Sequence, residues 1–254
     1  MQAEFSSEYT AYKEELTSYV ENFSTEGTKF GDQERNTLKL FELEGEKLNI
    51  KSFKVPHLIN KIAYRYFRKS KAQRSFEHAQ ILLEKGINTP KPVAYFQEGK
   101  GLLFGKSFYI SHHLNYDLTY RELIHDPKFP NRYEILRQFT QFTFQLHENG
   151  VEHLDHSPGN TLIIVNSISS YDFYLVDLNR MRFHDHMDYD MRIKNFARLT
   201  PDKNMVSAMS AEYAKLIGKD FHQVFSDMWR ETQEFQEKFQ RKRRLKQKLK
   251  GSRS

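Results

Sequence analysis

One segment of this 254-residue chain restricts its possible folds more than any other. It reads His153-x-Asp155-x-x-x-x-Asn160, and Asp177 follows after two short apolar segments that are joined by a polar turn. A turn around Pro158 would by itself explain an aspartate and an asparagine, because both residue types are common in turns. It does not explain a histidine and a second aspartate at these distances. We therefore interpret the segment as a functional loop and not only as a turn.

The spacing resembles that of the catalytic loop and the metal-binding aspartate of kinases. Phosphoryl transfer requires a carboxylate near the attacking hydroxyl and oxygen ligands that hold Mg2+ against the phosphates of ATP. We expect Asp155 to accept the hydroxyl proton, with His153 as a catalytic residue of the same loop. Asn160 and Asp177 are expected to bind both the metal and the cofactor.

An ATP-dependent kinase also needs a cation on the phosphates and an acid that orients this cation. The best lysine is Lys51, at the end of a strand in which apolar residues alternate, with Lys54 as the competing choice. Glu77 borders the apolar side of a later helix, whereas Glu84 lies too late in that helix for the role. We assign Lys51 to catalysis and cofactor binding, and Glu77 to the orientation of the lysine.

A phosphate-binding loop is expected between the first two strands of such a fold. The candidate is the segment 25–36, which contains Gly27 and Gly31 but no G-x-G-x-x-G pattern. Backbone amides can bind phosphates without that pattern. Gly27 and Gly31 are therefore our candidates for cofactor binding.

The order of predicted elements indicates the fold class. Helical spacing predicts helices over 8–22, 58–67, 75–85, 133–149, 188–199, 207–217 and 220–249. Alternation and turn residues predict strands over 37–43, 47–53, 93–96, 161–165 and 172–176, with strand and turn over 101–111. This order predicts an α+β, two-lobed protein-kinase-like fold, with a small, mostly antiparallel β N-lobe that carries a helix and a larger helical C-lobe. We place the nucleotide-binding lobe at 1–112, the catalytic lobe at 113–239 and a basic tail at 240–254.

Composition excludes several classes of protein. The chain is long enough for two lobes with a buried core. It has no cysteine, which excludes disulfides and cysteine metal sites. No apolar run approaches the roughly 18 residues of a membrane span, and the N-terminus lacks the pattern of a signal peptide. We expect a cytoplasmic protein.

The net charge of +6 is unevenly distributed. Residues 240–254 hold eight Lys and Arg and no acid, so the rest of the chain carries −2. A second basic block, 47–76, contains Lys61, Arg65, Arg68 and Lys69, which fall on one predicted helical face. Each such cation contributes about 1 kcal/mol near an anionic membrane. Peripheral docking at the inner face of the inner membrane through this face and 241–250 is one interpretation, and a solvated helix end is the other.

Over about residues 48–199 the chain resembles the lipopolysaccharide core kinases. These are bacterial enzymes of kinase-like fold that phosphorylate 3-deoxy-D-manno-octulosonic acid (Kdo) or heptose on lipid A–core. The resemblance rests on the segments 50–53, 70–77, 83–94, 146–160, 176–180 and 195–199, and Gly86-Ile87-x-Thr89-Pro90-x-Pro92-Val93-Ala94 is its most family-like stretch. It implies ATP and Mg2+ as cofactors, Asp155 as the base and the glycolipid lipid A–core as substrate. Leu178 and the pair His156-Ser157 depart from the family pattern, which leaves the acceptor sugar open.

Two other functions remain as alternatives. A soluble small-molecule phosphotransferase of the aminoglycoside- or choline-kinase type shares the loop, but the basic block argues against a cationic substrate. A non-catalytic kinase-like module that binds polyanions through the tail predicts salt-sensitive binding without ATP turnover. The complete set of candidate residues argues against this module, and we expect no nucleic acid as partner.

Overall fold

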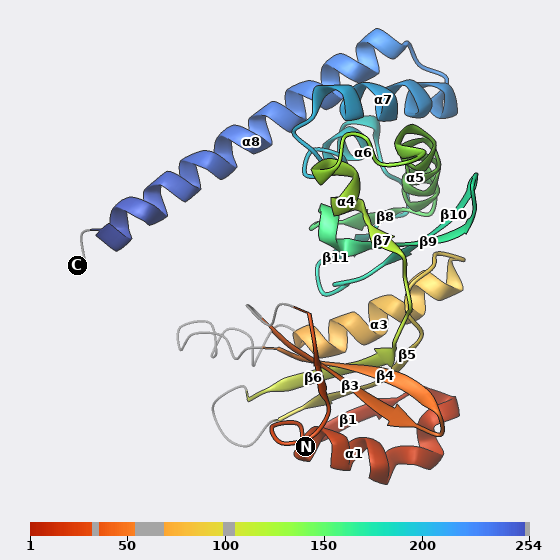
Figure 1. Ribbon diagram of the computed structural model, residues 1–254, viewed down its shortest axis with the longest axis vertical. Coiled ribbons are helices and arrows are strands. Elements are labelled where there is room, and N and C mark those ends of the chain that lie inside the picture. Colours follow the sequence, from red (N-terminus) through yellow and green to blue (C-terminus); the bar gives the residue numbers. More distant parts are fainter. Residues whose placement is uncertain (32–35, 54–68, 99–104, 252–254) are drawn as a thin grey trace. The chain divides into compact units, whose positions relative to one another are not determined.

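The computed structural model describes the chain except for residues 32–35, 54–68, 99–104 and 252–254. The described chain forms two compact units. The first comprises Met1–Asn115 and the short segment Val176–Asn179, and the second comprises Tyr116–Leu175 and Arg180–Ser254. Figure 1 gives the elements of both units.

The first unit is built on an antiparallel six-stranded sheet with the order β1-β5-β6-β4-β3-β2. Its elements are β1 (Gln2–Phe5), the 3-10 helix η1 (Ser7–Tyr12), α1 (Lys13–Glu21), β2 (Thr28–Phe30), β3 (Asn36–Leu43), β4 (Glu46–Phe53), α3 (Lys71–Glu84), β5 (Pro92–Gln97) and β6 (Ser107–His112). Glu44 and Gly45 join β3 to β4 with φ values of 50° and 79°. Such a two-residue turn with positive φ suits a hairpin, so the predicted hairpin is confirmed. The predicted helix 58–67 lies outside the described residues.

Two helices cover opposite faces of this sheet (Figure 1). α1 buries Leu16 and Val20 in a core cluster that contains Ile50 of β4. α3 lies on the other face and buries Phe76, whose ring centroid is 5.5 Å from that of Tyr95. The two faces of β4 therefore have different neighbours, so alternate residues of that strand reach different surroundings.

The second unit is mostly helical. Its elements are β7 (Leu118–Thr119), α4 (Tyr120–His125), α5 (Arg132–Glu148), β8 (Val151–His153), the 3-10 helix η2 (Pro158–Asn160), β9 (Thr161–Ser167), β10 (Ser170–Leu175), β11 (Met181–Phe183), α6 (Tyr189–Asn195), α7 (Lys203–Ile217) and α8 (Phe221–Gly251). The strands form two small sheets, β10-β9-β7 and β11-β8. α5 packs on α7, and α7 packs on α8.

α5 leads directly into the candidate catalytic loop. It buries Leu136 and Phe139 and ends before Gly150. Gly150 has φ +68°, and a Cβ atom there would lie 1.9 Å from the backbone oxygen of His184. Only glycine fits this close approach, and it lets β8 turn back against β11 with Met181 opposite His153.

The observed elements agree with the predicted fold class: an antiparallel β unit that carries a helix, and a larger helical unit. The predicted basic tail, 240–254, continues α8 as helix up to Gly251. Within the described part of the chain, no helix is both long and apolar enough to cross a membrane.

Candidate active site

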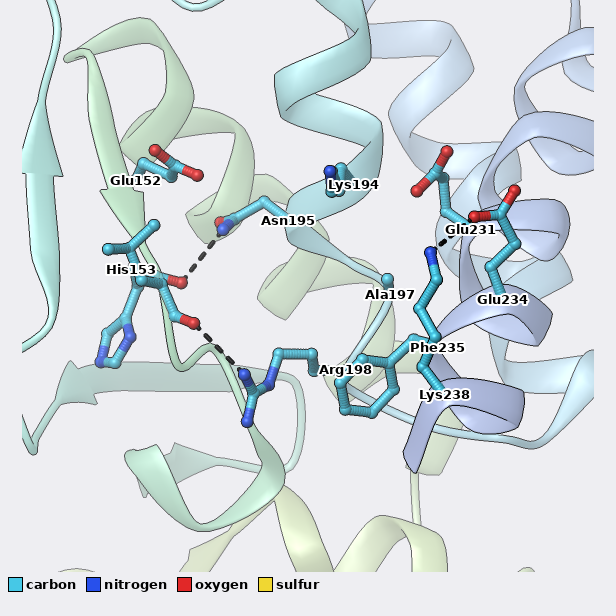
Figure 2. Close-up of a pocket in the computed structure, with 11 residues that line it drawn as sticks. Glu152, His153, Lys194, Asn195, Ala197, Arg198, Glu231, Glu234, Phe235 and Lys238 are labelled. Carbon is cyan, nitrogen blue, oxygen red and sulfur yellow. Dashed lines mark hydrogen bonds and ion pairs between the residues drawn. The ribbon is translucent and has the colours of Figure 1, made fainter. Parts of the chain in front are cut away.

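The loop that follows β8 carries the predicted base, Asp155. His153 is fully buried at the end of β8, and its Nδ1 accepts the backbone N–H of Asp155 at 3.1 Å. The backbone oxygen of His153 accepts a hydrogen bond of 3.1 Å from Nδ2 of Asn195 in α6. Figure 2 shows this amide directed at the histidine. The buried His153 thus fixes the backbone of the loop at Asp155, and its role in this structure is to position that residue.

Two arginines hold the Asp155 carboxylate. Nη2 of Arg198 lies 2.6 Å from one carboxylate oxygen, and Nη1 of Arg180 lies 3.3 Å from the other. The Asp155 side chain keeps 19% of its surface exposed. Charge-assisted hydrogen bonds of this kind are stronger than neutral ones and directional. The carboxylate is therefore aimed and still accessible, as a proton acceptor must be.

Arg198 connects this carboxylate to the last helix. Its guanidinium also donates to the backbone oxygen of Leu154 at 3.4 Å. Its Cζ atom lies 5.1 Å from the ring centroid of Phe235 in α8, a cation–π distance. Figure 2 shows Arg198 and Phe235 side by side in a pocket of about 250 Å3 that is lined by residues of β8, α6 and α8 and of the segments that follow β8 and α6.

Asn160 closes the loop at the end of η2. Its Nδ2 donates to the backbone oxygen of Asp155 at 2.8 Å. The amide nitrogen is used by this bond, so the Oδ1 atom is the group that can face a cation. An amide oxygen is a ligand that Mg2+ accepts.

The other candidate residues lie in the first unit. Nζ of Lys51 in β4 lies 2.8 Å from Oδ1 of Asp177, and Nδ2 of Asn179 donates to the same oxygen at 2.7 Å. The side chains of Lys51 and Asp177 are 18% and 30% exposed. Asp177 has φ +60°, a left-handed conformation that aspartate tolerates better than most residues. The structure thus brings together the predicted phosphate-binding lysine and the predicted metal-binding aspartate.

α3 holds the segment that carries Asp177. Nη1 of Arg74 donates to the backbone oxygen of Asn179 at 2.6 Å, and Nδ1 of His78 lies 2.7 Å from the backbone oxygen of Leu178. Burial lowers the pKa of His78, so the ring is neutral at pH 7 and its Nδ1–H is the donor. These two contacts explain why residues 176–179 belong to the first unit.

The structure does not bring Glu77 to Lys51. Glu77 lies in α3 with Oε2 2.7 Å from Nζ of Lys69, and Gln73 donates to its Oε1 at 3.0 Å. Among the described residues, the ion-pair partner of Lys51 is the Asp177 carboxylate. Lys51 therefore pairs with Asp177 in this structure, and not with Glu77 as predicted. The competing lysine, Lys54, lies outside the described residues.

The two candidate glycines differ in their surroundings. Gly27 precedes β2 with φ +76°, and a Cβ atom there would lie 2.5 Å from the ring of Phe41. Close packing and backbone conformation thus account for this glycine without a ligand. Gly31 follows β2 with φ +76°, and a Cβ atom there would have no described neighbour within 4 Å. It begins the turn between β2 and β3, most of which lies outside the described residues.

The oxygen donors of each unit are of the type that suits Mg2+ beside a nucleotide. Asp177 offers a partly exposed carboxylate in the first unit, and Asn160 offers an amide oxygen in the second. No group of three or more His, Cys, Asp and Glu side chains suited to a metal occurs in the described part of the chain. Mg2+ sites in ATP-dependent enzymes use one or two carboxylates plus substrate phosphates rather than a complete protein cage.

The sequence did not reveal the groups that hold the predicted residues. Arg198 and Arg180 hold Asp155, and Arg74 and His78 hold the segment around Asp177. Three of the four lie inside the segments that carried the family resemblance, 70–77, 176–180 and 195–199. Their position in these segments was the one sequence signal for a role in the site. Nothing in the local sequence indicates which carboxylate or carbonyl oxygen an arginine will contact.

Comparison with known proteins supplies the context for this geometry. Residues 13–226 match the sequence model of the lipopolysaccharide kinase (Kdo/WaaP) family. None of the curated proteins matches the chain. A solved structure described as WaaP in complex with acyl carrier protein is similar, with a TM-score of 0.63 and 16% sequence identity over 92% of this chain and 99% of that chain. At this identity the likeness concerns the fold, and it confirms the predicted protein-kinase-like architecture.

Proposed function

This chain belongs to the lipopolysaccharide kinase (Kdo/WaaP) family and is therefore a phosphotransferase that uses ATP; from this premise we propose the acceptor, the metal and the roles of the residues. The acceptor is a sugar hydroxyl, of Kdo or heptose, on lipid A–core. The cofactor that accompanies ATP is Mg2+. A glycolipid acceptor agrees with the family and with the cationic segments of the chain.

The pair formed by Lys51 and Asp177 carries this proposal. The sequence assigns one residue to the ATP phosphates and the other to the metal, and their side chains meet at 2.8 Å. A cation beside a carboxylate is the arrangement that positions phosphate oxygens and their metal together. Mg2+, when bound, neutralises negative charge on the phosphates as it develops during transfer.

Asp155 has the role of the general base. Its carboxylate accepts the proton of the sugar hydroxyl while the oxygen attacks the terminal phosphorus of ATP, the bond from this phosphorus to the bridging oxygen breaks, and ADP leaves. Arg198 and Arg180 keep the carboxylate in one orientation, and Nδ1 of His153 keeps the backbone of Asp155 in place. A base held in this way loses less orientational freedom in the transition state.

We also propose that the end of α8 brings the enzyme to an anionic membrane. Residues 240–254 carry eight cations, and the side chains of 241–245 are exposed on the helix. Of the other docking candidates, Lys61, Arg65 and Arg68 lie outside the described residues, and Lys69 is paired with Glu77. The helix end is therefore the better-supported contact, at the inner face of the inner membrane.

One assay tests the proposed acceptor. The purified chain is incubated with Mg2+-ATP and lipid A–core, and phosphate transfer is measured against an aminoglycoside and a general protein substrate. Transfer to lipid A–core that Asp155→Asn strongly reduces supports the proposal. Transfer to the aminoglycoside alone would move the function to a soluble small-molecule phosphotransferase, and polyanion binding without transfer would indicate a non-catalytic module.

The structural neighbour also names a partner that can be tested. That neighbour was solved with an acyl carrier protein. We propose an acyl carrier protein as a candidate partner of this chain, to be tested by co-purification. A chain that purifies without it and keeps full transfer activity would remove this partner from the proposal.

A further inference from the structure

A basic pocket of about 420 Å3 lies at one end of the sheet of the first unit. β2, β3 and β4, the segment after α1 and the residue before β6 contribute its walls. The eight lining residues are Phe23, Ser24, Lys29, Thr37, Lys39, Ser52, Phe53 and Lys106. Three of these described residues are lysines, three carry hydroxyls and none is acidic. The pocket thus offers cations and hydroxyl donors together.

Two of the lysines face each other across the sheet. Lys29 of β2 and Lys39 of β3 are directly paired in the antiparallel register. Like charges in directly opposite positions destabilise a sheet. Two lysines at paired positions therefore repel each other, and an anion near their ammonium groups would relieve this repulsion.

Lys39 is the unusual member of the pair because it is buried, with 6% of its surface exposed. Its Nζ donates to the backbone oxygens of Glu26 at 2.5 Å and Ser24 at 3.4 Å, and lies 5.2 Å from the ring centroid of Phe23. No described carboxylate forms an ion pair with it. Burying a charge without an opposite charge is costly, and the described partners of this ammonium group are two carbonyl oxygens and an aromatic ring.

Among the described residues, two glutamates near the pocket form no ion pair with its lysines. Oε2 of Glu98 accepts the backbone N–H of Lys106 at 3.0 Å. Glu26 contributes its backbone oxygen to Lys39, and its own side chain is exposed. Lys29 and Lys106 are exposed, and neither forms an ion pair with a described carboxylate.

The lysines of the pocket belong to a different part of the sheet surface from Lys51, although the lining residue Phe53 also borders the nucleotide site, with its ring centroid 5.3 Å from Nζ of Lys51. In the β3–β4 ladder Leu38 is opposite Lys51, whereas Thr37 is opposite Ser52 and Lys39 is opposite Ile50. Because alternate residues of a strand point to opposite faces, Lys39 and Ser52 lie on the face covered by α1. Lys51 lies on the other face, where it reaches Asp177.

From this arrangement we propose that the pocket binds a phosphate-bearing ligand. Lysine ammonium groups bind phosphate as point charges, and the hydroxyls of Thr37 and Ser52 can donate to the remaining phosphate oxygens. The phosphate belongs either to a lipid headgroup or to a soluble phosphorylated compound, and both present the same chemistry to the lysines.

The test uses the full chain with Lys51→Met, so that phosphate binding at the proposed nucleotide lysine does not contribute. Inorganic pyrophosphate is titrated calorimetrically into this protein, into the same protein with Lys29→Ala and Lys106→Ala, and into a control with Lys47→Ala and Lys85→Ala. The control removes the same number of exposed lysines from other places in the first unit. We expect the dissociation constant to rise at least about tenfold in the pocket variant and less than about twofold in the control.

A second measurement identifies the source of the phosphate. Association with vesicles of phosphatidylglycerol and phosphatidylcholine is compared for the pocket variant and the control. A selective loss of vesicle binding together with pyrophosphate affinity assigns the pocket to a lipid headgroup. Unchanged vesicle binding with lost pyrophosphate affinity assigns it to a soluble phosphorylated compound. Equal pyrophosphate affinity in the pocket variant and the control overturns the proposal.

Discussion

The ammonium nitrogen of Lys51 lies 2.8 Å from a carboxylate oxygen of Asp177, although the two residues are 126 positions apart in the chain. Lys51 comes from the middle of a sheet, and Asp177 comes from a four-residue segment that α3 ties to that sheet through Arg74 and His78. A partly exposed ion pair of this kind contributes about 1 kcal/mol or less to stability. Its placement therefore matters for chemistry more than for folding.

Lys51→Met should reduce transfer strongly and stability slightly. Loss of charge-assisted contacts to phosphate costs about 1.5–3 kcal/mol, which corresponds to a fall of about 10- to 150-fold in kcat/KM. The midpoint of chemical unfolding should change little. Lys47→Met, at an exposed position of the same strand, is the matched control. Equal and mild effects of the two substitutions would remove Lys51 from the phosphate site.

Asp177→Asn should abolish the Mg2+ dependence of ATP binding. Asparagine tolerates the left-handed backbone at φ +60°, so this substitution removes the charge of the metal ligand without straining the loop. The measurement is ATP affinity with and without Mg2+. If Mg2+ strengthens ATP binding in the variant as much as in the parent, Asp177 is not the principal metal ligand.

Asp155→Asn should lower turnover by about 10²–10⁴ with little change in ATP affinity, because it removes the proton acceptor and keeps the shape. Arg198→Met should lower turnover by a smaller factor, since we expect Arg198 to contribute to catalysis through Asp155, which it holds at 2.6 Å. The two substitutions combined should then cost no more than Asp155→Asn. Additive losses in this double-mutant cycle would show that Arg198 has a role independent of Asp155.

The same region shows what the sequence could predict. Helices and strands with clear periodicity were predicted well: the hairpin of β3 and β4, the helices α5 and α8, and the pair β9 and β10 lie where the pattern placed them. Short elements were missed, among them β1, β2 and α4, because two to six residues carry too little periodicity to distinguish them from turns. β1 is recognised only through its pairing with β5, which is a tertiary contact.

The candidate site likewise contains residues that the local sequence predicts and contacts that depend on the tertiary structure. Spacing alone predicted Asp155, Asn160 and Asp177 as site residues, because the loop that carries the first two is a local feature of the sequence. The structure pairs Lys51 with Asp177 and not with the predicted Glu77. The sequence could not distinguish the two acids as partners of the lysine, because the path of the chain after β10 is what brings Asp177 to Lys51. The buried state of His153 was also hidden, because it depends on the contact between β8 and α6.

Buried His147 should make the protein less stable as pH falls. Burial lowers its pKa from 6.5 to about 3, and it is held neutral between Tyr213 and Asn195. Between these two pH values the unfolded chain binds a proton that the folded chain does not, so stability falls with pH by up to about 1.4 kcal/mol per unit. Burial lowers the pKa of His156 too, which adds a slope of the same sign.

The measurement is the free energy of unfolding in urea at several pH values from 7 to 5. His147→Gln should flatten the dependence relative to the parent, even if it lowers stability at every pH. An unchanged slope in this variant would show that His147 gains its proton in the folded state at the ordinary pKa.

The end of α8 should control membrane association without affecting the chemistry. Residues 241–244 are four consecutive exposed cations on a continuous helix. Replacing all four by glutamine keeps the helix and removes attraction of about 1 kcal/mol per residue for an anionic surface. This attraction decays over a Debye length of about 8 Å at physiological salt, so the loss should be largest at low salt.

Vesicle flotation measures the first effect, and transfer to a soluble, delipidated core sugar measures the second. We expect weaker flotation with vesicles that contain phosphatidylglycerol and unchanged transfer to the soluble sugar. Among the described residues, none of those that hold Asp155 lies beyond Phe235, and no hydrogen bond or ion pair joins the substituted segment to the Asp155 carboxylate. If transfer to the soluble sugar also fails, the helix end supports the catalytic unit. If flotation is unchanged, the cations form a solvated helix end, and docking must use another surface.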